Sequence, residues 1–164
     1  MLRVFFVFFI SFGLSYVSLW GSEGQFSAVF SNANAVLFAL AALFGAMSLA
    51  FFNYVEGVMK DVPKKLKIQN SQAYAKVVSA LTELKQEIIS NIFLVVILLL
   101  VAFVAGAVGD MVFLKRVKFS DFLVWAVLSI RGACLLSIVV ATLVQLAGFV
   151  TANKLRAEIS MWAE

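Results

Sequence analysis

Residues 88–109 read IISNIFLVVILLLVAFVAGAVG and contain no charged side chain. A helix needs roughly 20 apolar residues to cross the hydrocarbon core of a bilayer, and this stretch meets that length. Only Ser90 and Asn91, at its start, are strongly polar. The stretch therefore predicts a transmembrane helix, and the number of such stretches in the chain decides the fold.

Three further apolar blocks occur along the chain: Val4–Trp20, Ser27–Phe52 and Phe122–Ala152. Hydrophobic residues make up 63% of the chain and charged residues 13%, against about 45–50% and about 25% in soluble domains. We therefore expect an all-α fold, a single polytopic membrane domain over residues 1–164. The four spans are expected at about residues 3–20, 27–53, 88–110 and 132–152.

The first block has the charged start and apolar body of a secretory signal peptide. No small-x-small cleavage site precedes Gly21, so we expect a retained span. Its aromatic rings suit lipid contact better than tight helix packing. These rings belong to Phe5, Phe6, Phe8, Phe9 and Phe12.

The basic residues predict the orientation, because cytoplasmic loops carry an excess of lysine and arginine. With four spans and a cytoplasmic N-terminus, the basic residues inside are Arg3, Lys60, Lys64, Lys65, Lys67, Lys76, Lys85, Lys154 and Arg156. Those outside are Lys115, Arg116, Lys118 and Arg131. This distribution favours both termini in the cytoplasm. A three-span alternative places the chain from Lys115 onward in the cytoplasm, with Phe122–Ala152 re-entrant or peripheral.

Residues 54–87 form the one long polar stretch between spans. Apolar residues at helical spacing continue the second span up to Pro63, which ends the helix. A second helix is expected from about Ser71, with an apolar face that runs into the third span. Together they predict an antiparallel cytosolic helical hairpin. Residues 152–164 predict a short amphipathic helix on the same side, which lies in the headgroup layer or braces the hairpin.

Lysines cluster at the tip of this hairpin. One interpretation is a solvated topology signal attracted to anionic lipid headgroups. The other is a docking surface for an acidic cytosolic protein. The candidate docking residues are Lys60, Lys64, Lys65, Lys67 and Arg156.

The fourth block is too long for one straight span, because its 31 residues would extend about 46 Å. We predict a break at Arg131–Gly132, with an outer interfacial helix over residues 119–130. Arg131 then lies at the interface, near phosphate or a carboxylate such as Asp110. The alternative places Arg131 inside the bundle, lining a polar path together with uncharged groups such as Asn91 and Gln145.

Small residues recur every fourth position, which lets helices approach closely within one chain or between copies. The candidate packing residues are Ala42, Ala46, Gly106, Ala133, Ser137 and Ala141. We therefore expect a homo-oligomer embedded in membrane lipid.

This sequence contains few residues of the kinds that carry out catalysis. The chain has no histidine and a single cysteine, Cys134, without a candidate base. Glu83 and Glu87 share a helix face, but with Lys85 nearby a solvated face is expected. We expect no enzyme activity, no catalytic residue, no cofactor, no metal site and no direct binding of nucleic acid.

The layout of four spans, a cytosolic helical hairpin and both ends inside resembles the KwaA family, the small membrane subunits of bacterial Kiwa anti-phage defence systems. This resemblance implies a homo-oligomer in the inner membrane that responds to phage attack at the envelope. It also implies a cytosolic, DNA-associating partner of the KwaB type.

Three functions follow as hypotheses. The first is a membrane sensor or scaffold that engages a cytosolic effector. The second is a small oligomeric pore, whose ion flux would depend on Arg131 or Gln145. The third is an accessory subunit of a larger membrane transporter.

Overall fold

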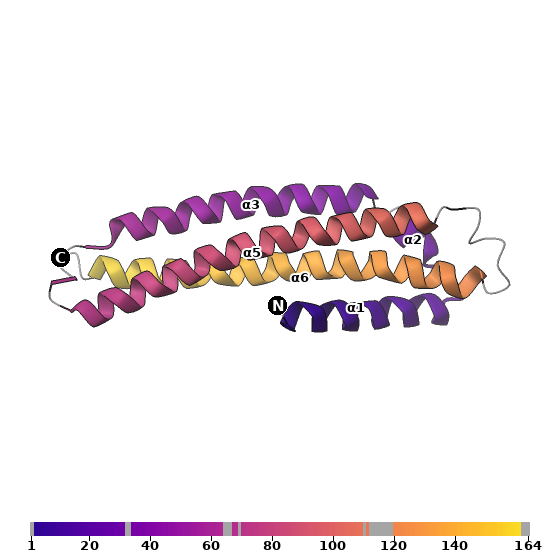
Figure 1. The fold of residues 1–164 in the computed structure, drawn as a ribbon, viewed down its shortest axis with the longest axis horizontal. Coiled ribbons are helices and arrows are strands. Elements are labelled where there is room, and N and C mark those ends of the chain that lie inside the picture. Colours follow the sequence, from indigo (N-terminus) through magenta and orange to yellow (C-terminus); the bar gives the residue numbers. More distant parts are fainter. Residues whose placement is uncertain are drawn as a thin grey trace. The chain divides into compact units, whose positions relative to one another are not determined.

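The computed structural model describes residues 2–31, 34–63, 67–68, 70–109, 111 and 120–161. Its helices are α1 (Leu2–Gly21), α2 (Ser27–Ser31), α3 (Asn34–Asp61), α5 (Ser71–Gly109) and α6 (Ser120–Met161), shown in Figure 1. No strand occurs among the described residues, which confirms the all-α prediction.

Three of the helices are long and apolar enough to cross a membrane: Asn34–Asp61, Ser71–Gly109 and Asp121–Ser160. The chain is therefore a multi-pass membrane protein by helix length and composition. The apolar part of α1, Phe6–Gly21, is shorter. A fourth crossing by α1 stays a prediction.

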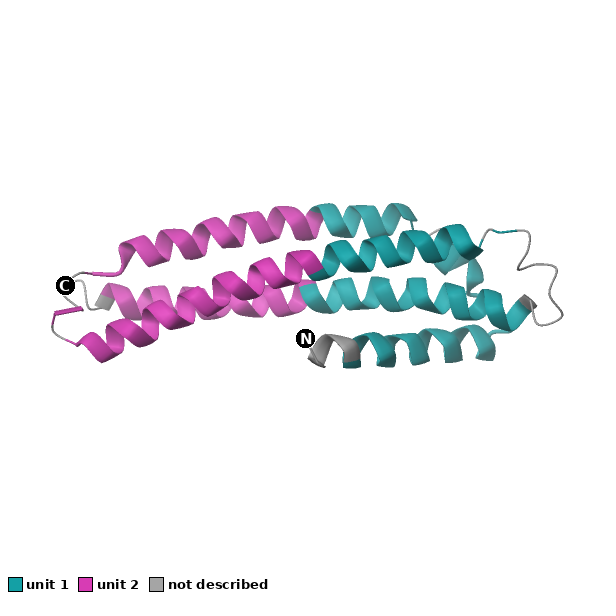
Figure 2. Cartoon of the chain, in the orientation of Figure 1, with its two compact units in different colours: residues 1–42, 94–141 teal, residues 43–93, 142–164 magenta. Residues whose placement is uncertain are grey.

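Two compact units divide the chain, as Figure 2 shows. Unit 1 comprises residues 1–42 and 94–141, and unit 2 comprises residues 43–93 and 142–164. Each of α3, α5 and α6 contributes residues to both units.

In unit 1, α6 passes through Arg131–Gly132 without a break. The predicted break and the separate outer helix over residues 119–130 are therefore wrong. Gly132 serves close packing instead, because a Cβ placed there would lie 2.6 Å from Ser15 Oγ and 2.7 Å from Phe30 Cε1. A glycine keeps its helical hydrogen bonds, so a missing side chain alone does not bend a helix.

The second predicted span also differs from the structure. Residues 27–53 do not form one helix, since α2 ends at Ser31 and α3 begins at Asn34. The sequence carries a signal at this boundary, the polar residues Ser31, Asn32 and Asn34, which the prediction of one span did not use.

In unit 2, side chains from α3, α5 and α6 form one apolar core. Its buried members are Phe51, Val55, Val58, Leu81, Ile88, Ala152 and Ile159. They recur at helical spacing, so each helix turns one apolar stripe inward. The predicted hairpin helices have the expected ends, Asp61 before Pro63 and Ser71 after the loop.

The C-terminal residues continue α6 to Met161 and do not form a separate helix. Because Ala152 and Ile159 lie in the unit 2 core, this segment braces α3 and α5, one of the two predicted roles. The cytosolic placement of these helices stays a prediction.

Candidate functional site

Arg131 lies inside unit 1, where its side chain is 3% exposed. Nη1 donates a hydrogen bond to the carbonyl oxygen of Ser31 at 3.0 Å, and Nη2 donates to Asn34 Oδ1. Both acceptors are uncharged. A buried charge is costly unless it is fully hydrogen-bonded, and Nε is buried without a partner among the described residues.

Gly106 on α5 provides the space for this guanidinium. A Cβ at this position would lie 3.2 Å from Arg131 Cζ and 3.4 Å from Nε. Such contacts are tighter than ordinary van der Waals distances, so a side chain at this position would require the guanidinium to shift by a few tenths of an ångström. The buried position of Arg131 beside α5 therefore depends on a glycine at residue 106.

The two partners of Arg131 flank the interruption between α2 and α3. Ser31 is the last residue of α2, whose final carbonyl groups lack intrahelical partners, and Asn34 is the first residue of α3. Polar backbone in an apolar environment requires hydrogen bonds from neighbouring groups. Arg131 thus binds both sides of the interruption at once.

In unit 2, a second polar contact joins α6 to α3. Gln145 is 4% exposed, and its Nε2 donates to Ser48 Oγ at 2.8 Å. Ser48 Oγ in turn donates to the carbonyl oxygen of Phe44 at 2.7 Å. Gln145 Oε1 is buried without a partner in the described part of the chain. Gln145 and Asn91 line the same small cavity.

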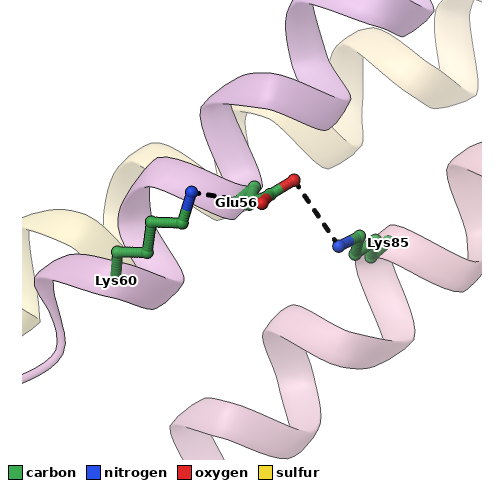
Figure 3. Close-up of polar contacts among 3 residues, drawn as sticks. All are labelled: Glu56, Lys60 and Lys85. Carbon is green, nitrogen blue, oxygen red and sulfur yellow. Dashed lines mark ion pairs between the residues drawn. The ribbon is translucent and has the colours of Figure 1, made fainter.

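Charged side chains link α3 to α5 near the loop end of unit 2. Glu56 lies between two lysines, as Figure 3 shows: Lys60 Nζ is 3.2 Å from Oε1 and Lys85 Nζ is 3.7 Å from Oε2. The hydrogen bond from Lys60, with the charges of both lysines, holds the pKa of the Glu56 carboxyl below its ordinary value. Lys85 Nζ also lies 4.5 Å from the centre of the Phe52 ring.

Arg156 links α6 to α3 in the same unit. Its Nη2 lies 3.8 Å from Asp61 Oδ2, and its Cζ lies 5.5 Å from the centre of the Tyr54 ring. Tyr54 donates from its hydroxyl to Asn153 Oδ1. A shallow surface groove of about 400 Å³ follows these side chains, with Ala157 and Ser160 completing its lining. We call it the Arg156 groove.

Comparisons with protein-family models, with curated proteins and with solved structures gave no match for this chain. Function is therefore argued from the geometry of these two units.

The predicted docking residues are placed as follows. Lys60 and Arg156 both lie in unit 2 and pair with carboxylates of α3. Lys67 is exposed, with Nζ 5.9 Å from the centre of the Tyr74 ring. Lys64 and Lys65 lie outside the described residues, as does Asp110.

The predicted packing residues divide into two groups. Gly106, Ala133, Ser137 and Ala141 are buried in unit 1. Ala42 and Ala46 are exposed, so they are not closely packed by the residues that the structure describes. They stay candidates for contact between copies.

Sequence reasoning missed the polar face of α1. Ser11, Ser15 and Leu19 recur every fourth residue and are buried, whereas Phe6 and Phe9 are exposed. The buried face of α1 therefore comprises two serines and Leu19, while Phe6 and Phe9 face outward and Phe8 and Phe12 are half-buried. The spacing Ser11-x3-Ser15 is the signal that would have shown this face.

In the described part of the chain, no group of three or more histidine, cysteine, aspartate and glutamate side chains is placed to hold a metal ion.

Proposed function

We propose that this chain is a membrane scaffold or sensor subunit whose unit 2 docks a soluble protein. The supporting observation is helix length. α5 has 39 residues and α6 has 42, which correspond to about 58 Å and about 63 Å at 1.5 Å per residue. A hydrocarbon core is about 30 Å thick, so much of each helix extends beyond it.

The charged residues at the loop end of unit 2 fit an aqueous location for that extension, whereas Leu43, Leu49, Leu143 and Val150 of the same unit expose apolar side chains that suit lipid. Glu56, Lys60, Lys85 and Arg156 carry charge on its surface around an apolar three-helix core. Ion pairs this exposed contribute little to stability, because water and salt screen them. Because these pairs are weak, Lys60, Lys85 and Arg156 can leave the carboxylates of their own chain and bind carboxylates of a partner with little loss of stability.

The Arg156 groove gives the docking surface a specific chemistry. Arg156 offers guanidinium donors, Tyr54 an aromatic face and Asn153 an amide. Arginine and tyrosine are enriched among the residues that dominate protein interfaces. The groove suits a segment of a partner protein that carries a carboxylate beside an apolar side chain.

The resemblance to the KwaA family extends this proposal. On that basis the chain assembles as a homo-oligomer in the bacterial inner membrane, with both termini in the cytoplasm. It responds to perturbation of the envelope by phage and engages an effector of the KwaB type.

The test is co-purification of the full-length chain from membranes with a co-expressed protein of the KwaB family. Arg156→Glu is expected to reduce the recovered partner at least about tenfold, because the reversed charge repels the carboxylate that the groove would bind. Lys76→Glu is the matched control, since Lys76 is exposed on α5 but does not line the groove. Equal recovery with all three proteins, or no recovery with the wild type, contradicts the proposal.

A further inference from the structure

A small cavity lies in unit 2 among α3, α5 and α6. It offers about 10 Å³ of water-accessible space, which is room for about one water-sized particle. Three polar side chains line it, Glu87, Asn91 and Gln145, and the rest of the lining is apolar side chains and one glycine. Glu87 is exposed and Gln145 is buried, so the cavity runs from an open edge into the interior.

Gln145 is a buried polar side chain of this cavity, and its hydrogen bond to Ser48 fixes which way its amide group faces. The single proton of the Ser48 hydroxyl is donated to the carbonyl oxygen of Phe44, so Ser48 Oγ accepts from Gln145 Nε2. This assigns the amide orientation of Gln145. Its Oε1 is left buried and unpartnered among the described residues, and such a group destabilises the fold unless another species satisfies it.

The polar lining supplies oxygen ligands and one negative charge. Gln145 offers an amide oxygen, Asn91 a second amide oxygen and Glu87 a carboxylate, and no basic side chain lines the cavity. Carboxylate and carbonyl oxygens are the ligands of hard cations. Divalent sites of this kind commonly use several carboxylates or retain several waters, for which this cavity has no room.

We propose that this cavity binds one small monovalent cation of the sodium type, held by Gln145, Asn91 and Glu87. The ion links α5 to α6 because Glu87 and Asn91 lie on α5 and Gln145 lies on α6. This inference goes beyond docking of a partner and does not depend on it. It also replaces the sequence-based expectation that Glu87 belongs to a purely solvated face.

The test is thermal unfolding of the purified full-length chain in detergent micelles, in sodium, potassium or choline chloride at equal ionic strength. Sodium is expected to raise Tm by about 3 °C or more relative to choline, since a ligand that binds only the folded state stabilises it. Potassium is expected to give a smaller rise, because it is the larger ion. Broadening of the sodium NMR signal by the protein provides a direct measure of binding.

Two variants make the assignment specific. Glu87→Gln keeps the shape of the side chain and removes its charge, so it is expected to abolish the sodium-dependent rise in Tm while keeping the Tm in choline. Glu83→Gln is the matched control one turn earlier, where the carboxylate accepts from Ser79 Oγ and does not line the cavity. This control is expected to keep the full rise.

Several results overturn the inference. Equal Tm values in the three salts for the wild type would assign the cavity to a bound water only. An equal rise with potassium would exclude a site selective for the smaller ion. A full sodium-dependent rise in Glu87→Gln would place the ion elsewhere.

Discussion

Arg131 Nη1 lies 3.0 Å from the carbonyl oxygen of Ser31, the residue that ends α2. The same guanidinium donates to the Asn34 side chain at the start of α3. One buried arginine in the first third of α6 therefore hydrogen-bonds to the end of α2 and to the start of α3. Its planar guanidinium presents donors in a fixed fork, which suits one backbone acceptor and one side-chain acceptor at the same time.

Replacing Asn34 by leucine is expected to destabilise the protein by about 1.5–3 kcal/mol, since it leaves Nη2 of a buried cation without its acceptor. The measurement is thermal unfolding in detergent micelles followed by circular dichroism. Asn53→Leu serves as the control, because Asn53 is an exposed asparagine on the same helix. A loss of stability no greater than that of the control would contradict the structural role of Asn34.

The surroundings of Arg131 show where sequence reasoning stops. A single charge within the apolar block Phe122–Ala152 identified the residue as a candidate site. Its partners Ser31 and Asn34 lie about a hundred positions away, so no local pattern around Arg131 identifies them. Contacts between distant segments depend on tertiary packing, which hydropathy does not encode.

Gly132 is expected to tolerate no side chain. Gly132→Ala places a Cβ 2.6 Å from Ser15 Oγ, and we expect a loss of about 1–3 kcal/mol from overpacking. Gly45→Ala is the opposite control, because a Cβ at Gly45 meets nothing within 4 Å. Removing a mid-helix glycine there is expected to stabilise by about 0.5–1 kcal/mol. Thermal unfolding of the two variants checks both signs, and an equal response would contradict close packing at Gly132.

The helices of unit 2 followed from sequence more closely than those of unit 1. Pro63 and the polar loop gave a helix end near Asp61, and the apolar periodicity of Leu81 and Ile88 gave a buried face on α5. In α1 the polar residues are mostly single serines within apolar sequence, so periodicity did not distinguish the serine face that the structure buries. The buried face of a helix is predicted from the alternation of polar and apolar residues along the sequence. The helices of unit 1 show little such alternation.

The pH dependence of stability is expected to include Glu56. Its pKa in the folded protein is lowered below 4.5 by Lys60 and Lys85, so the folded state favours the charged carboxylate. The corresponding stabilisation is present above about pH 4.5 and is lost as the pH falls through the lowered pKa. Unfolding measured from neutral to acidic pH should therefore show a smaller loss of stability in Glu56→Gln than in the wild type. The control Glu83→Gln should follow the wild type, and identical profiles for Glu56→Gln and the wild type would contradict the prediction.

The exposed alanines of α3 lead us to expect contact between copies of the chain at this face. Ala42 and Ala46 form a small-residue ridge that is exposed in the described part of the chain, and such ridges allow close approach of helices in membranes. In a Cys134→Ser background, which removes the single cysteine, Ala46→Cys is expected to form a disulfide-linked dimer under mild oxidation in membranes. Leu43→Cys is the control, since Leu43 is also exposed but lies about 60° from Ala46 around the helix. Equal cross-linking at both positions would indicate random collision, whereas cross-linking at Ala46 alone would place this ridge between copies of the chain.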